Sequence, residues 1–192
     1  MGRNPERRAA LVDAAIEVLA QEGARGLTFR AVDTQAAVPV GTASNYFTGR
    51  DDLFMQAGAR IHVRNTPGPG AVDEAMRPAG PTREMLTGLM RALVQRMADD
   101  RSGYLALLEL RLEATRRPAL QEQLDRNVRA AFEASAQDYV YARLPGDADT
   151  FLVLYLAMTG LMLEHFTLPG MLSDARLDQL VETVVTRIVP AG

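Results

Sequence analysis

A chain of 192 residues, 47% of them hydrophobic, is long enough to bury a sizeable core as one domain or as a small domain joined to a larger one. The absence of cysteine excludes disulfides, thiolate nucleophiles and cysteine-based metal sites. The net charge of −3 conceals a slight basic excess in residues 1–64, which hold eight arginines against seven acidic residues. We expect a soluble, cytoplasmic protein without membrane contact. The N-terminus lacks the apolar run of a signal peptide, and the longest apolar run, 151–163, is shorter than the ~20 residues of a membrane span.

The first helix predicted by the sequence begins at Pro5 and ends at Gly23. Asn4 is a favourable N-cap, and proline suits the first helical position because no partner is needed there for its missing N–H. Glycine tolerates the left-handed conformation that commonly ends a helix. The apolar residues between these signals recur at helical spacing: Leu11, Ala14, Ala15, Val18 and Leu19.

The next stretch, residues 27–53, predicts two short helices joined by a tight turn, followed by the start of a third. Thr28 is a favourable N-cap for the first of them, and Pro39 is expected to open the second, which ends near Phe47. The side chains at 41–45 are small or polar, so this helix is poor at building a core but can come close to another surface. A helix of this kind, presented by a helix-turn-helix, fits the major groove of DNA.

A longer helix follows, with Thr48 and Asp51 in capping-box spacing at its start. Its predicted buried face consists of Leu53, Phe54, Ala57 and Ile61. The proline- and glycine-rich residues 65–81 cannot continue this helix, so we place a domain boundary there, with a short helix at 72–76 inside it.

Helical periodicity returns after this boundary and continues to the end of the chain. The predicted helical segments are 82–97, 104–112, 118–144, 147–166 and 173–189. Neither a strand pattern nor an internal repeat appears in the sequence. The sequence therefore predicts an all-α protein with a three-helix, helix-turn-helix domain at residues 1–64 and a larger helical domain at residues 65–192.

The run TFRAVDTQAAVPVGTASNYFTGRDDL, residues 28–53, resembles the DNA-binding end of the tetracycline-repressor-like (TetR) family of transcriptional regulators. The resemblance is specific over residues 5–53 and architectural beyond them. It implies a homodimeric, all-helical repressor that binds a palindromic operator and releases it when a small-molecule effector binds the second domain. It also implies that the predicted helices at 147–166 and 173–189 form a four-helix bundle with those of a second copy.

The resemblance extends to individual residues of the predicted helix-turn-helix. Positions that align with residues facing base edges are Arg30, Val40, Gly41, Thr42 and Ser44. Positions that align with phosphate ligands are Thr28, Asn45, Tyr46 and Arg50. The chemistry agrees in kind, because hydroxyl, phenol, amide and guanidinium groups bind phosphates, while arginine reads guanine and a threonine methyl contacts thymine.

Three positions depart from the family pattern. This chain has Ser44 where the family usually has tyrosine, Asp33 where it has alanine, and Ala37 where it has glycine. Tyr46 is expected to take over part of the role of the missing tyrosine. We expect Asp33 to serve as a cap or to orient Arg30 rather than to face DNA, which leaves the base preference open.

An effector pocket is expected in the second domain, and its unidentified ligand should be largely apolar. The candidate lining residues are Met85, Leu89, Met97, Tyr104, Leu108, Glu109, Phe132 and Met158. Ordinary core packing is the alternative for each of them, because methionine also fills irregular interiors. Glu109 and Glu113 either point to solvent at a helix edge or orient a ligand.

No enzyme, metal or cofactor signature is present in the sequence. His62 and His165 are the two histidines, and neither belongs to a recognisable arrangement with an acid and a nucleophile. A glycine-rich phosphate loop, metal-ligand spacing and a nucleophile elbow are all lacking. The alternative to a repressor is a helical ligand- or partner-binding protein whose N-terminal domain no longer reads DNA, a reading favoured by the missing tyrosine and the faint basic excess.

Overall fold

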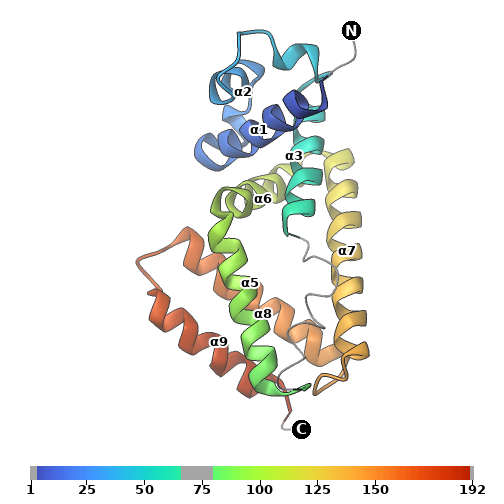
Figure 1. The fold of residues 1–192 in the computed structure, drawn as a ribbon, viewed down its shortest axis with the longest axis vertical. Helices are drawn as coiled ribbons and strands as arrows, with labels where there is room; N and C mark the ends of the chain where they lie inside the picture. The colour runs from blue at the N-terminus through green and yellow to red at the C-terminus, as the bar shows by residue number, and fades with distance from the viewer. Residues whose placement is uncertain (1–3, 66–79, 191–192) are drawn as a thin grey trace. The chain divides into compact units, whose positions relative to one another are not determined.

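A computed structural model describes residues 4–65 and 80–190, and every regular element within these two ranges is a helix (Figure 1). The elements are α1 (Pro5–Gly26), α2 (Phe29–Gln35), the 3-10 helix η1 (Ala43–Asn45), α3 (Arg50–Asn65), α5 (Arg83–Asp99), α6 (Arg101–Ala114), α7 (Pro118–Tyr141), α8 (Ala148–Thr167) and α9 (Asp174–Ile188). The predicted all-α class is confirmed. The predicted short helix at 72–76 and most of the predicted boundary lie outside the described residues.

The chain forms two compact units whose composition differs from a simple cut near residue 64. The first unit contains α1, α2, η1 and α3, together with α6 and the start of α7 as far as Arg129. The second contains α5, the remainder of α7, α8 and α9. The predicted division at residues 65–81, which puts α6 in the C-terminal domain, stays a prediction; in the structure α6 packs against α1 and α3. The compact N-terminal unit is therefore larger than the predicted helix-turn-helix domain.

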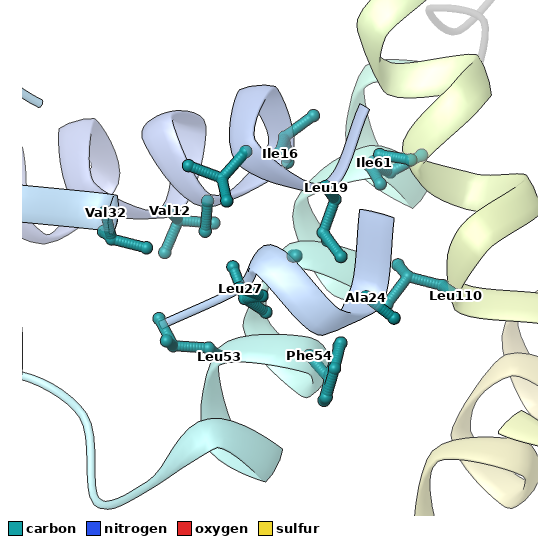
Figure 2. Close-up of a cluster of buried hydrophobic side chains, with 14 of the residues drawn as sticks. Val12, Ile16, Leu19, Ala24, Leu27, Val32, Leu53, Phe54, Ile61 and Leu110 are labelled. Carbon is teal, nitrogen blue, oxygen red and sulfur yellow. The ribbon is translucent and has the colours of Figure 1, made fainter. Parts of the chain in front are cut away.

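The core of the first unit lies where α1, α3 and α6 meet (Figure 2). The predicted apolar face of α3 is confirmed, because its four residues are at most 1% exposed. The α1 stripe is buried as well. Leu110 of α6 is fully buried in the same cluster, and its Cδ1 lies 3.7 Å from the position that a Cβ on Gly58 of α3 would occupy. Ion pairs complement this core, since Arg60 and Arg64 of α3 each donate to Oδ1 of Asp13 at 2.8 Å.

Local signals set the start of both long N-terminal helices, with one correction. The Asn4 side chain caps α1 as predicted, accepting from the amides of Glu6 at 2.9 Å and Arg7 at 3.3 Å. At α3 the predicted partner of Thr48, Asp51, is wrong. The amide of Thr48 donates to Asp52 Oδ2 at 3.0 Å instead. Helix α3 begins at Arg50, so the carboxylate that reaches back to Thr48 belongs to the residue after the predicted one.

Gly23 kinks α1 and does not end it. Its φ of +70° is the positive value that the sequence predicted for a helix end, yet the chain makes a further helical turn to Gly26. The ψ of −176° at Gly23 is extended, so the two helical parts meet at an angle. Glu109 of α6 fills the space beside the kink, with Oε2 3.1 Å from the position of a Cβ on Gly23. The end of α1 is thus shaped by a contact from another helix.

The second unit is built from α5, α8 and α9, with the C-terminal part of α7. Arg91 of α5 forms a two-pronged ion pair with Asp178 of α9, with N–O distances of 2.5 and 2.9 Å. Phe132 of α7 contacts Phe151 and Tyr155 of α8, with ring centroids 5.2 Å apart in each pair. By length and composition, α8 is the one helix in the described ranges that could cross a membrane.

Candidate DNA-binding site

Helix α2 begins as the sequence predicts. Thr28 has extended φ and ψ, and its hydroxyl oxygen accepts from the amide of Ala31 at 3.1 Å. The side chain of Arg30, the second residue of the helix, is exposed. Ala37 follows the helix with a φ of +52°, a left-handed conformation that glycine adopts without steric cost. This backbone requirement explains why the resembled family usually has glycine at the position.

The reading segment, which we define as residues 39–47, is not the continuous α-helix that the sequence predicts. Only Ala43–Asn45 are helical, in a single 3-10 turn, and residues 40–42 form turns before it. Gly41 interrupts any helix from Pro39, because its φ is +94°. Polar side chains also bond to the local backbone: the Ser44 hydroxyl and the Asn45 amide both donate to the Gly41 carbonyl, at 2.8 and 3.0 Å.

Asp33 joins α2 to the reading segment. Its side chain is 1% exposed, and its two carboxylate oxygens accept from the amides of Gly41 and Ala43, both at 2.7 Å. Asp33 thus bonds to backbone amides as a capping residue does, but to amides eight and ten residues further along the chain. The alternative that it orients Arg30 is wrong, since its oxygens face the amides of the reading segment.

The reading segment is fixed to the core on one side and open on the other. Ala43 is fully buried and Phe47 is 3% exposed. Val40 is 76% exposed, and Ser44 and Asn45 are also exposed. The exposed side chains are those expected to meet DNA, whereas the buried ones hold the segment on the unit.

The segment has a further contact that sequence reasoning missed. Arg8 of α1 donates from Nη1 to the carbonyl of Tyr46 at 2.9 Å, and its guanidinium lies 5.0 Å from the ring centroid of Phe47. Because 38 residues separate Arg8 from Tyr46, no local pattern could have indicated this pair.

Arg50, predicted to bind a phosphate, makes contacts inside the first unit. Its Nη2 donates to the carbonyl of Ala24, and its guanidinium lies 5.2 Å from the ring centroid of Phe54. Within the described ranges, its Nε is buried without a hydrogen-bond partner. The phosphate role stays a prediction.

Glu109 is half-buried and bonds to the backbone of α1. Its Oε2 accepts from the amide of Ala24 at 3.1 Å, so the peptide groups of Ala24 bond to α6 through the amide and to Arg50 through the carbonyl. On the next turn of α6, Glu113 pairs with Arg117 at 2.6 Å. This hydrogen bond is the main reason that the pKa of Glu113 lies below its ordinary value.

An open pocket of about 630 Å³ lies beside these groups, within the first unit. Its lining residues are Glu22, Gly23, Ala24, Arg25, Arg50, Glu109, Leu112, Glu113 and Arg116. Glu109 is the one residue that it shares with the predicted effector site, so this pocket is a different place in the molecule.

The predicted effector residues divide between the two units. Tyr104, Leu108 and Glu109 belong to the first, and Met85, Leu89, Met97, Phe132 and Met158 belong to the second. The three methionines are buried, as either a pocket lining or an ordinary core requires. Burial also raises the pKa of the Tyr104 phenol. The role of the set in binding a ligand stays a prediction.

Comparison with known proteins defines the class of this chain. Residues 11–57 match the model described as bacterial regulatory proteins, tetR family, and residues 81–191 match the tetracyclin repressor-like C-terminal domain. The second match alone spans more than half of the chain. The chain therefore belongs to the tetR family. It is a helix-turn-helix transcriptional regulator and not an enzyme, as the resemblance predicted.

Individual relatives are similar to this chain over nearly its whole length. The HTH-type nicotine-responsive transcriptional repressor HdnoR of Paenarthrobacter nicotinovorans is 25% identical, over 95% of this chain and 96% of its own. A TetR-family structure from Streptomyces coelicolor A3 is 32% identical with a TM-score of 0.69, covering 97% of this chain and 100% of that one. The multidrug binding protein EbrR, complexed with imidazole, is 29% identical with a TM-score of 0.68, covering 98% of both chains.

Proposed function

We propose that the protein is a repressor that binds a palindromic operator as a homodimer and leaves it when a small organic effector binds. The reading segment is the observation that carries this proposal. It presents Val40, Ser44 and Asn45 to solvent from a backbone fixed by buried Ala43 and Phe47. Exposed side chains on a rigid support are what base recognition requires, since bases are read in the groove while phosphates only position the protein.

The surface of α8 supports the homodimer. Leu152, Val153, Leu156 and Leu163 are between 40% and 57% exposed, although the helix is strongly apolar. No atom of the residues that the structure describes lies within 4 Å of a Cβ built on Gly160 of the same helix, so another helix can approach closely there. Contiguous exposed apolar surface of this kind marks an interface. A second copy pairing through 147–166 and 173–189 would cover it, a better explanation for a helix within the matched C-terminal domain than a membrane span.

Two-fold symmetry then sets how the dimer reads DNA. Two reading segments would enter successive major grooves, with centres about 34 to 36 Å apart. An effector that binds more tightly to a dimer with a different spacing lowers operator affinity, and linkage requires that DNA lower effector affinity by the same factor.

The relatives indicate the kind of effector. HdnoR is named for its response to nicotine, and EbrR has been crystallised with imidazole, ethidium, proflavin and malachite green. The second unit of this chain contains touching aromatic rings at Phe132, Phe151 and Tyr155. Aromatic side chains stack favourably on flat organic molecules. We infer a small, largely apolar, ring-containing effector bound in the second unit.

Operator binding is tested with the full chain and DNA fragments from around its own coding region, titrated across salt concentration. A repressor binds one fragment far more tightly than random DNA, typically by a factor of about 10³ or more, and with a steep negative salt slope. Arg30→Ala should reduce this preference, whereas Arg25→Ala, which also removes an exposed arginine of the first unit, should not. Equal, weak affinity for all fragments would favour the alternative, a helical ligand- or partner-binding protein that no longer reads DNA.

A further inference from the structure

Asp33 is a buried carboxylate with an unusual set of partners. It is 1% exposed, and among the residues that the structure describes it forms no ion pair. Its oxygens accept instead from two backbone amides, those of Gly41 and Ala43, eight and ten residues further along the chain. Hydrogen bonds to an ionised acceptor are stronger than those between neutral groups.

These two bonds hold a segment that has little regular structure of its own. η1 contains three residues, too few for the cooperative hydrogen bonding that stabilises longer helices. Gly41 has a φ of +94°, and glycine loses more conformational freedom on folding than any other residue. The conformation of residues 41–43 therefore depends on contacts from outside the segment, and the Asp33 carboxylate bonds to both of its ends.

We propose that Asp33 is a positioning residue for operator recognition, which sets the preference for operator over other DNA without touching DNA itself. This inference rests on the proposed function. Val40, Thr42 and Ser44 lie next to the two amides that Asp33 holds. If those amides are released, the reading segment must be ordered again in each specific complex, and that entropy is subtracted from specific affinity. Non-specific affinity, which comes from phosphate charge, is left nearly unchanged.

Two substitutions at this position remove the bonds to different extents. Asp33→Ala removes both acceptors. Asp33→Asn keeps the side-chain volume but offers one acceptor oxygen. Its NH₂ group, itself a donor, then faces the second backbone N–H, so one of the two hydrogen bonds is lost. Thr82→Ala is the control, because the Thr82 hydroxyl accepts from the Met85 amide at 3.2 Å at the start of α5, in the other unit and outside the proposed dimer helices. It removes a capping oxygen without touching the reading segment.

The test compares the affinities of the three full-length variants and the wild type for operator and for random DNA. We expect Asp33→Ala to lower operator affinity roughly 10- to 100-fold, the entropy of ordering about one or two backbone residues in each specific complex, and random-DNA affinity by less than about threefold. Asp33→Asn should fall in between, and Thr82→Ala should keep the wild-type ratio. Amide hydrogen exchange should accelerate at residues 41 and 43 in both Asp33 variants.

Each outcome decides a different point. If the wild type does not distinguish operator from random DNA, the proposed function fails and this inference fails with it. If the wild type does and folded Asp33→Ala keeps the same ratio, or loses both affinities equally, only the positioning role is overturned. If Asp33→Ala does not fold, Asp33→Asn decides by the same ratio. Unchanged exchange at residues 41 and 43 in a folded variant would also overturn the role.

Discussion

Leu110 tests whether α6 belongs to the core of the DNA-binding unit, where the structure places it, or only to a C-terminal domain. The side chain is fully buried and points from α6 toward Ala24 of α1 (Figure 2). Leu110→Ala removes buried carbon atoms and leaves a cavity, a combination that costs about 2 to 5 kcal/mol. We expect the upper half of this range. α6 is held at Ala24 by Glu109, which limits how far the helices can close the cavity.

A loss of this size is a large part of the free energy of unfolding of an average domain. For a chain of this length it should lower Tm by about 7 to 20 °C. Amide hydrogen exchange gives the location: protection should fall along α1 and α3, because both helices share the cluster that contains Leu110.

Leu112→Ala provides the control on the same helix. Leu112 is 60% exposed, so its truncation should change stability by less than about 0.5 kcal/mol. If Leu110→Ala were as mild as Leu112→Ala, or left exchange in α1 unchanged, the packing of α6 into the N-terminal core would be refuted.

Three further outcomes follow from the structure. Gly58→Ala should stabilise α3 by about 0.5 to 1 kcal/mol, because a Cβ at this position would meet its neighbours at ordinary contact distances of 3.5 Å or more. A lower Tm than wild type would show that the methyl group does not fit there. Glu113→Gln should destabilise the protein at neutral pH but progressively less in acid. Arg117 lowers the folded-state pKa of Glu113, so its contribution is present above the unfolded pKa of about 4.3 and is lost as the pH falls through the folded value. Tm measured from pH 7 to pH 3 checks this, and a constant difference from wild type would be inconsistent with it. Leu156→Glu should yield monomers in sedimentation, while Leu168→Glu, which is equally exposed at 57% but lies beyond the end of α8, should leave the dimer intact.

Much of the fold could be predicted because its signals are local. The Asn4 and Thr28 caps, the buried face of α3 and the all-helical class each depend on residues within a few positions of one another. A cap bonds to the next turn, and a stripe repeats with the helical period, so both are visible in the linear sequence.

Errors in the site occurred where a side chain bonds to backbone far from it in sequence. Asp33 bonds across the turn to Gly41 and Ala43, Arg8 to Tyr46, and Glu109 to Ala24. The helix predicted from Pro39 fails for the same reason. Its local pattern permits a helix, but the Asp33 carboxylate binds amides that a helix would arrange differently.

The amino-acid sequence by itself determined the helical class, the starts of α1 and α2, the family and the exposed residue types of the reading segment. Only the tertiary structure decided how the segment is held, that Arg50 and Glu109 both bond to Ala24, and that α6 joins the N-terminal core. The physical reason is the separation along the sequence over which each interaction acts. Periodicity and capping act over a few residues, whereas a buried carboxylate or leucine takes whichever partners the packing of distant helices places beside it.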